Sequence, residues 1–111
     1  LTEDHSLLND YKKIAQLTQE EIKNFPHKNI IVRALGMKES VDVDNQKIRF
    51  QQGDVYLLCT DGLTGEVDDG EISQVLLDSG DDLEKACDAL IEKACSHGGR
   101  DNITAIILKV E

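Results

Sequence analysis

The first part of the chain shows apolar residues at helical spacing. Between Ser6 and Gln16 they recur every three or four positions, which is the pattern of an amphipathic helix, and a serine is a favoured N-cap. The run therefore predicts a short helix over Ser6–Gln16. Thr18, with a glutamate three residues later, forms a capping-box pattern. It predicts a second helix over Gln19–Asn24, which ends before Pro26 because the residue before a proline disfavours the helical conformation.

The middle of the chain is rich in β-branched and apolar residues. Asn29–Leu35 is predicted to be a strand, Lys47–Gln51 alternates apolar and polar residues with period two, and Asp54–Thr60 is mostly apolar. A Gly-Asp turn at Gly53 separates the last two segments, so the pattern predicts that they pair as a hairpin. Because Val55–Leu58 is apolar at every position, we expect this strand to be covered on both faces.

The C-terminal part returns to helical spacing. Asp68 is a predicted N-cap of a helix that ends at Gly80, and Asp81 is a predicted N-cap of a longer helix closed by two glycines at 98 and 99. A β-branched strand over 102–110 follows. The predicted order is two helices, three strands, two helices and one strand, which indicates an α+β fold with layered sheets and helices.

Charge narrows the range of partners. Twelve basic and twenty-two acidic side chains give a net charge of −10, and such a field repels nucleic acid and anionic lipid surfaces. The chain has no apolar run of the roughly 20 residues that span a bilayer and no signal-peptide pattern at its start. We expect a single domain in the cytoplasm, with no nucleic-acid or membrane partner.

Two aspartates stand at predicted strand ends. Asp61 follows the strand that ends at Thr60, and Asp101 precedes the last strand. If these strands are neighbours, both carboxylates lie at one rim of the sheet, and oxygen ligands without nearby histidine or cysteine suit Mg²⁺ or Mn²⁺. The alternative is that Asp-Gly and Asp-Asn are simply turn residues. The spacing alone leaves both interpretations open.

Four strings, in order, resemble one family. "LTEDHSLL", "NIIVRALG", "GDVYLLCTDGL" and "GGRDNITAIIL" are similar to the C-terminal half of the type 2C (PPM) metal-dependent serine/threonine protein phosphatases of the bacterial kind. The match spans nearly the whole chain. The resemblance implies part of an α-β-β-α layered sandwich with antiparallel sheets. It also implies hydrolysis of phosphate monoesters on phosphoproteins by a water that two or three Mn²⁺ or Mg²⁺ ions activate.

The resemblance also assigns residues. Asp61 of "TDG", Asp101 of "GGRDN" and Asp4 of "TEDHS" match metal ligands of the family, Asp4 at a weaker third ion. Asn102 and Thr60 are expected to support the ligands by hydrogen bonding. Residues 7–28 resemble the mobile flap beside the active site. A phosphoprotein substrate and a cognate serine/threonine kinase are the expected partners.

Part of the family pattern has no counterpart. Nothing in this chain matches the "DGxGG" loop, the acid of a short Glu-Asp motif or the phosphate-binding arginine that the family's N-terminal half supplies. We therefore interpret residues 1–111 as the C-terminal portion of one catalytic domain whose N-terminal half is absent. Such a fragment is expected to be inactive alone and able to self-associate. Two alternatives are a non-catalytic binding or regulatory module that keeps the phosphatase fold, and a generic acidic α+β domain.

Overall fold

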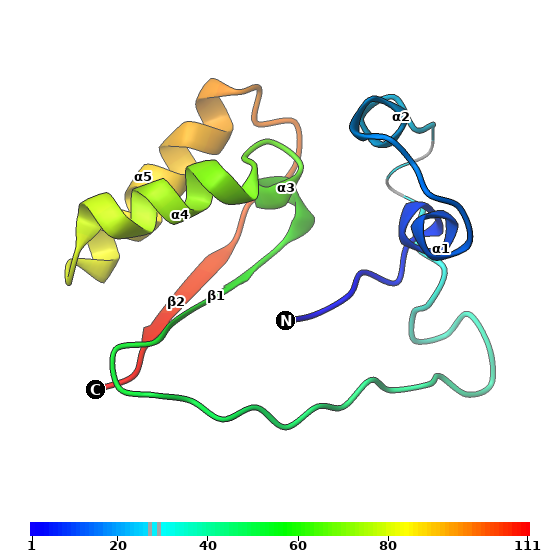
Figure 1. Cartoon of the computed structure of the whole chain (residues 1–111), viewed down its shortest axis with the longest axis horizontal. Helices are drawn as coiled ribbons and strands as arrows, with labels where there is room; N and C mark the ends of the chain where they lie inside the picture. The colour runs from blue at the N-terminus through cyan, green and yellow to red at the C-terminus, as the bar shows by residue number, and fades with distance from the viewer. Residues whose placement is uncertain (27, 29) are drawn as a thin grey trace. The chain divides into compact units, whose positions relative to one another are not determined.

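The computed structural model describes residues 1–26, 28 and 30–111. The chain forms two compact units, Leu1–Lys47 and Ile48–Glu111, and each is described by itself below. Among the described residues, the N-terminal unit contains helices α1 and α2, whereas the C-terminal unit contains strands β1 and β2 and helices α3, α4 and α5. These elements are labelled in Figure 1. The predicted α+β class is confirmed by this segregated mixture of helices and antiparallel strands.

The helices of the N-terminal unit form where the sequence predicts them. Helix α1 spans Leu7–Ile14, and the Ser6 hydroxyl accepts a hydrogen bond from the Asn9 amide. Helix α2 spans Gln19–Lys23, and the Thr18 hydroxyl accepts from the Glu21 amide. Each cap satisfies an amide that has no partner within its own helix, so both predicted N-caps are confirmed.

The strand predicted over 29–35 is wrong for the residues that the structure describes, Asn29 lying outside them. Pairing is limited to one isolated antiparallel bridge between Ser6 and Ile31. The Leu7 amide donates to the Ile30 carbonyl at 3.0 Å, and the Val32 amide donates to the His5 carbonyl at 2.9 Å. The pairing cannot continue because the partner segment turns into α1 at Leu7. Strand propensity needs a neighbouring extended segment to take effect.

The predicted hairpin is also wrong. Strand β1 (Val55–Cys59) pairs with β2 (Ala105–Lys109) in antiparallel register, from Val55 opposite Lys109 to Cys59 opposite Ala105. Lys47–Gln51 is not a strand. The turn itself is confirmed, since Gly53 has a φ of 91° and the Asp54 amide donates to the Gln51 carbonyl at 3.1 Å. Period-two alternation identifies an extended segment but does not say which segment it pairs with.

Of the two helices that follow β1 directly, one was not predicted and the other agrees with the prediction. Helix α3 (Asp61–Thr64) was not predicted. Helix α4 (Asp69–Ser79) has the predicted capping box, in which the Asp68 side chain accepts from the Glu71 amide and the Glu71 side chain accepts from the Asp68 amide.

Helix α5 (Leu83–Ser96) begins one residue later than predicted. Its N-cap is Asp82, which accepts from the Lys85 amide. The predicted N-cap, Asp81, instead binds the Lys109 ammonium of β2. The glycines at the far end of α5 have φ values of 137° and 54°, which confirms that they close the helix.

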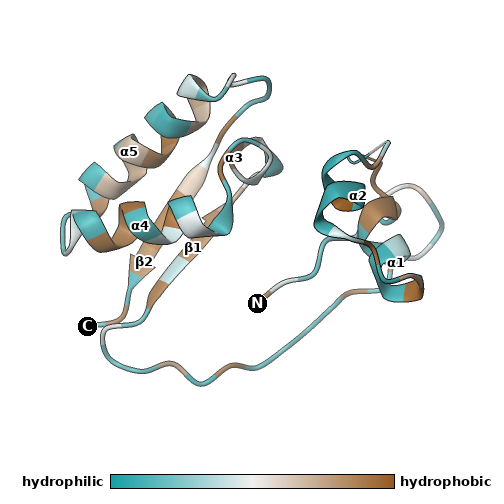
Figure 2. Ribbon diagram, turned by 45° about the horizontal axis from the view of Figure 1, so that its top comes forward, coloured by the Kyte–Doolittle hydropathy of each residue, from teal (hydrophilic) through white to brown (hydrophobic). Residues whose placement is uncertain are grey.

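The core of the C-terminal unit lies between the helices and one face of the sheet. Figures 1 and 2 show α4 and α5 on the same side of β1 and β2. Leu57 of β1 and Ile107 of β2 are opposite each other and pack toward these helices. The buried core residues are Leu63, Val67, Ile72, Ala86, Leu90, Ala94 and Ile107.

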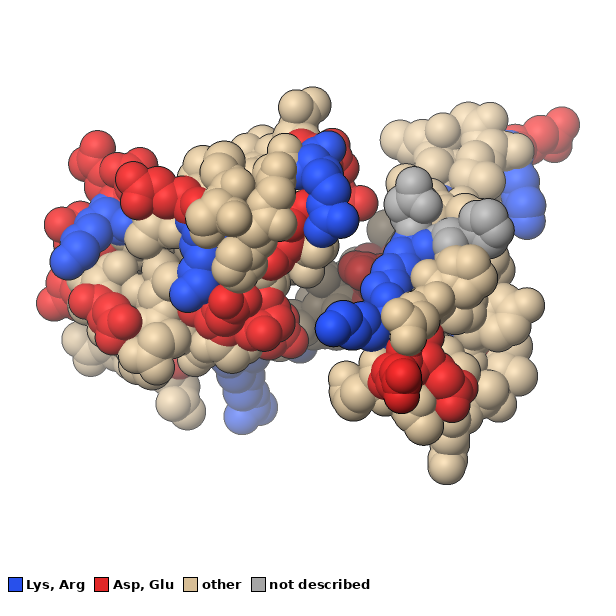
Figure 3. All heavy atoms as spheres, turned by 90° about the horizontal axis from the view of Figure 1, so that it is seen from above, with Lys and Arg blue, Asp and Glu red and all other residues tan. Residues whose placement is uncertain are grey.

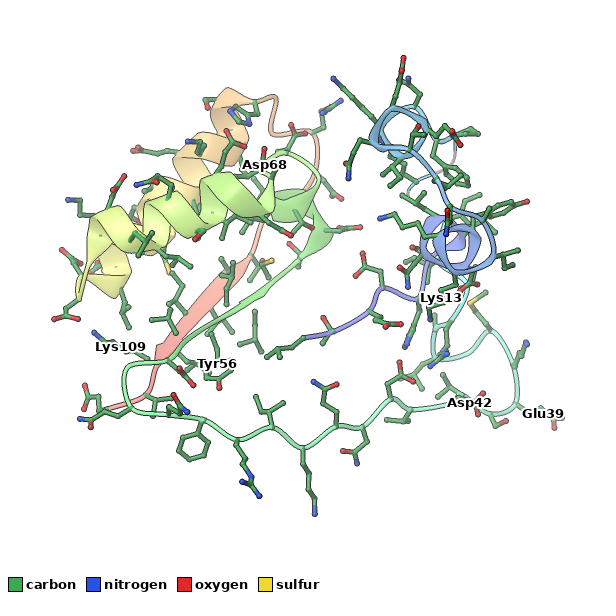
Figure 4. All side chains as sticks on the ribbon, in the orientation of Figure 1. Lys13, Glu39, Asp42, Tyr56, Asp68 and Lys109 are labelled. Carbon is green, nitrogen blue, oxygen red and sulfur yellow. The ribbon has the colours of Figure 1, made fainter. Side chains whose placement is uncertain are left out.

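The other face of the sheet, called the open face below, is uncovered within the described chain. It carries Tyr56 opposite Leu108 and Leu58 opposite Ile106. Leu58, Ile106 and Leu108 are each more than half exposed, so the expectation that β1 is covered on both faces is wrong for this structure. A groove of about 360 Å³ runs along this face, and Tyr56 and Lys109 of its lining are labelled in Figure 4. The lining residues are Ile48, Phe50, Tyr56, Leu58, Leu108, Lys109 and Val110.

Among the described residues, no helix has the length and apolar character needed to cross a bilayer. Figure 3 shows acidic side chains at several separate places on the visible face of the C-terminal unit.

Candidate functional site

Asp61 lies at the junction between β1 and α3. Thr60 is extended, with φ −82° and ψ 162°, and Asp61 is the first residue of the helix that follows. The Thr60 hydroxyl makes no capping bond. It instead donates to the Asn102 carbonyl at 3.3 Å and accepts from the Thr104 amide at 3.0 Å. The acid therefore stands at a strand-to-helix junction that is tied to the segment before β2, not at the corner of a hairpin.

Asp101 lies in the loop between α5 and β2. Its side chain is exposed, and Oδ1 accepts a hydrogen bond from the backbone amide of Asn102 at 2.7 Å. β2 begins at Ala105, three residues later than the strand predicted over 102–110. Asp101 is therefore a loop residue, whose carboxylate is turned back toward its own backbone.

The structure brings the two acid-bearing segments together at Gly62. A Cβ atom at this glycine would lie 2.1 Å from the Asn102 carbonyl oxygen and 3.4 Å from the Asp101 Cβ atom. The first distance is far below van der Waals contact, so only glycine fits at this position. The Thr60 amide also donates to the Thr104 carbonyl at 3.0 Å. Asp61 and Asp101 thus come from neighbouring backbone segments at one end of the sheet.

Asp4 belongs to the N-terminal unit, where it is exposed. The residue after it, His5, is 2.6 Å from Asp44 through its Nε2 atom, and the Arg33 guanidinium donates to the same carboxylate at 2.9 Å. The hydrogen bond from His5, and then that from Arg33, hold the pKa of Asp44 below its ordinary value. These contacts connect the segment around Asp4 to the segment around Asp44. The role of Asp4 at a third ion stays a prediction.

The donor chemistry at Asp61 and Asp101 fits a hard divalent cation. Both groups are exposed carboxylates, and neighbouring carboxylates with room for water suit Mg²⁺ or Mn²⁺. Within the described ranges, no three or more histidine, cysteine, aspartate or glutamate side chains form a group that could hold a metal ion. Two carboxylates are fewer than the six ligands that Mg²⁺ takes, so they would supply only part of a coordination shell.

An ion pair beside the two acids was not anticipated from the sequence. Glu66 follows α3, and its side chain is only 6% exposed. The guanidinium of Arg100, the residue before Asp101, donates from Nε at 2.7 Å and from a terminal nitrogen at 3.1 Å to the two carboxylate oxygens. This hydrogen bonding lowers the pKa of Glu66 and raises that of Arg100. Arg100 is visible in the motif, but its partner is 34 residues away, a pairing that only the fold reveals.

A comparison with family models places most of the chain in one family. The model described as Stage II sporulation protein E (SpoIIE) matches residues 17–111. Among curated proteins, the serine/threonine phosphatase stp of Listeria innocua is 43% identical over 109 residues, which are 98% of this chain and 43% of that protein. The chain thus spans less than half the length of this relative.

Solved structures are similar over the whole chain. Serine/threonine phosphatase Stp1 from Staphylococcus aureus has a TM-score of 0.89 at 34% identity, covering 100% of this chain and 43% of that one. The catalytic domain of serine/threonine protein phosphatase PstP, in complex with 2 manganese ions, has a TM-score of 0.77 at 30% identity and covers 100% of this chain and 45% of that one.

Proposed function

Because the chain belongs to the family described by the Stage II sporulation protein E model and is part of a type 2C (PPM) phosphatase domain, we propose that it contributes metal-binding residues to a serine/threonine phosphoprotein phosphatase. The observation that carries this proposal is the contact at Gly62, which juxtaposes the segments of Asp61 and Asp101. Both acids stand in the strings "TDG" and "GGRDN", which match the family.

Each residue has a distinct part in this proposal. Asp61 and Asp101 hold Mn²⁺ or Mg²⁺ in the complete domain, and Asp4 adds a ligand to a third, weaker site. When bound, such ions supply an activated water and neutralise charge on the phosphate. Thr60 fixes the Asp61 junction to the neighbouring segment, and the Asn102 amide orients the Asp101 carboxylate. Residues 1–111 form the C-terminal portion of the domain, with 7–28 as the flap.

The wider setting follows from the same family. The substrate is a phosphoprotein, its phosphate is added by a cognate serine/threonine kinase, and the site of action is the cytoplasm. A net charge of −10 disfavours nucleic acid as a partner. The 111 residues alone do not hydrolyse phosphate esters, because Asp61 and Asp101 leave most of a cation's coordination positions to water.

Turnover of a phosphoserine peptide tests the proposal. The protein at its natural length is assayed with Mn²⁺, as wild type and as the variants Asp61→Asn and Asp101→Asn. We expect each variant to lose more than about 100-fold in activity, since even groups that only support a ligand are worth 10- to 100-fold. Asp88→Asn, at an exposed acid of α5, is the matched control and keeps wild-type turnover.

Two results would contradict it. One is undiminished Mn²⁺-dependent turnover in Asp61→Asn. The other is a wild-type protein of natural length that has no Mn²⁺-dependent turnover, which would favour a binding or regulatory module on the phosphatase fold.

A further inference from the structure

We propose that Glu66 and Arg100, called the Glu66–Arg100 clamp below, are positioning residues that hold Asp101 in place for cation binding. The inference rests on the proposed function, because it concerns the same metal site. Neither side chain is a ligand in this proposal. The clamp acts by fixing the loop that carries Asp101 against the segment that follows Asp61.

The Glu66 side chain is only 6% exposed, and both of its carboxylate oxygens have a partner. Its neighbours in the chain include Leu63 and Val67, which are 0% and 1% exposed, so the acid lies at the edge of the core. A buried carboxylate is costly unless both oxygens have partners. Arg100 meets this need with two side-chain donors, one to each oxygen, and its backbone amide lies 3.4 Å from Oε1. Two parallel bonds of this kind fix direction as well as distance.

The loop closes around the Glu66 carboxylate. A Cβ atom at Gly98 would lie 3.3 Å from Glu66 Oε2, and this glycine has a φ of 137°. The imidazole of His97 donates from Nδ1 to the Glu66 carbonyl at 2.7 Å. The end of α5 is therefore attached to residue 66 through side chain and backbone alike.

These contacts place Asp101 between two fixed points. On its N-terminal side, Arg100 is bound to Glu66. On its C-terminal side, the Asn102 carbonyl lies against Gly62 and accepts from the Thr60 hydroxyl. Two glycines precede Arg100, and glycines give a loop wide conformational freedom. Without the clamp, the nearest remaining contact on the N-terminal side is that of His97 with the Glu66 carbonyl, four residues before Asp101. The Asp101 carboxylate then samples positions away from Asp61.

A merely structural role predicts a different result. If the ion pair only closes the edge of the core, its loss lowers stability and leaves the cation affinity of the folded protein unchanged. If it positions Asp101, its loss weakens cation binding even in variants that remain folded. Arg100 is well suited to this distinction because its side chain is 76% exposed, so substitution leaves the core intact.

The test is a Mn²⁺ titration of the protein at its natural length, followed by electron paramagnetic resonance of free Mn²⁺. Wild type is compared with Glu66→Gln and Arg100→Lys, and folding is checked by circular dichroism. Lysine keeps the charge but cannot make the two-bond fork. We expect the Mn²⁺ dissociation constant to rise about 10- to 100-fold in both variants. The matched control is Asp81→Asn, which breaks the Asp81–Lys109 ion pair and leaves Mn²⁺ affinity unchanged.

Wild-type Mn²⁺ affinity in a folded Arg100→Lys variant would overturn the clamp. A different result, a wild-type protein that binds no Mn²⁺, would contradict the proposed function. Amide hydrogen exchange then decides the inference, because the Asn102 amide donates to Asp101 and reports its orientation without metal. Faster exchange of this amide in Glu66→Gln supports the clamp, and unchanged exchange overturns it.

Discussion

At the scale of single residues, the site depends on one position where a side chain does not fit. Gly62 follows Asp61 directly, and the Asn102 carbonyl occupies the place where its Cβ atom would be. The glycine thus permits the close approach of two backbones that bear the two acids. Its role is steric and is not due to an unusual backbone angle, since Gly62 is not among the positive-φ glycines.

The first prediction concerns alanine at this position. Gly62→Ala forces the Asn102 segment outward, because its Cβ atom would lie 2.1 Å from the Asn102 oxygen. We expect a loss of about 1–3 kcal/mol in the free energy of unfolding, the usual cost of overpacking, together with weaker Mn²⁺ binding. Gly70→Ala is the control, since its Cβ atom meets only the Asp68 Oδ1 atom, at 3.4 Å. Urea denaturation of both variants checks the prediction, and equal stability would contradict it.

The second prediction concerns pH and Glu66. The hydrogen bond from Arg100 holds the pKa of Glu66 below its ordinary value. A carboxylate with a lowered pKa in the folded state adds stability that is fully present above its unfolded pKa, about 4.3 for glutamate. This stability is lost as the pH falls through the folded pKa. At pH 7 the wild-type protein is thus expected to have a higher melting temperature than Glu66→Gln. This difference in melting temperature should disappear in acid.

Thermal melts of the two proteins between pH 7 and pH 3 measure this difference in melting temperature. An identical difference at every pH would show that Glu66 acts through packing alone and not through its charge.

At the scale of elements, the helices begin at signals formed by residues close together in the sequence, whereas strand pairing depends on residues far apart. The capping box of Asp68 and Glu71 is formed within four residues, and α1 and α2 begin at the N-caps that their sequences specify. Strand pairing joins residues about fifty positions apart, as Val55 and Lys109 show. The period-two pattern of 47–51 therefore predicted a strand that does not form, and it gave the wrong partner for β1.

The third prediction tests the cap of α4. Asp68→Ala removes the acceptor for the Glu71 amide and the reciprocal bond, which we expect to cost about 1 kcal/mol of unfolding free energy. Asp88→Ala, at an exposed position inside α5, removes an acid without removing a cap and is the control. Guanidinium denaturation gives both values. A loss no larger in Asp68→Ala than in Asp88→Ala would contradict the assignment.

The candidate site could be predicted only in part from the sequence, because some of its contacts join residues that are far apart in the chain. Asp61 and Asp101 stand in recognisable strings, and their location at strand ends suggested a shared rim. The contact of Gly62 with Asn102 and the pairing of Glu66 with Arg100 depend on how α3 and the loop after α5 meet. Helix α3 was missed because Asp61-Gly62 is also a strong turn signal, and the burial of Leu63 in the core favours the helix.

At the scale of the whole molecule, the sheet has one covered and one open face. Leu58, Ile106 and Leu108 on the open face are 52%, 55% and 53% exposed. Water disfavours such surface by about 25 cal/mol per Å², and an exposed apolar patch favours association. The chain by itself therefore has a strong drive to cover this face.

The fourth prediction follows for the isolated 111 residues. We expect them to self-associate through the open face, with a mass that rises with concentration in sedimentation equilibrium. Leu58→Lys places a charge on this face and should shift the chain toward monomer. Leu77→Lys, at a residue of α4 that is 73% exposed, is the control and should associate like wild type. A wild-type chain that stays monomeric over the whole concentration range would contradict the prediction.

The central claim is that Asp61 and Asp101 bind the same cluster of divalent cations. The most direct measurement is a crystal structure of the protein at its natural length with Mn²⁺, using anomalous scattering at the manganese edge. The account predicts anomalous peaks within about 2.0–2.6 Å of carboxylate oxygens of both residues, the range for hard cations and carboxylates. Peaks confined to other sites, with both carboxylates bound only to water, would contradict it.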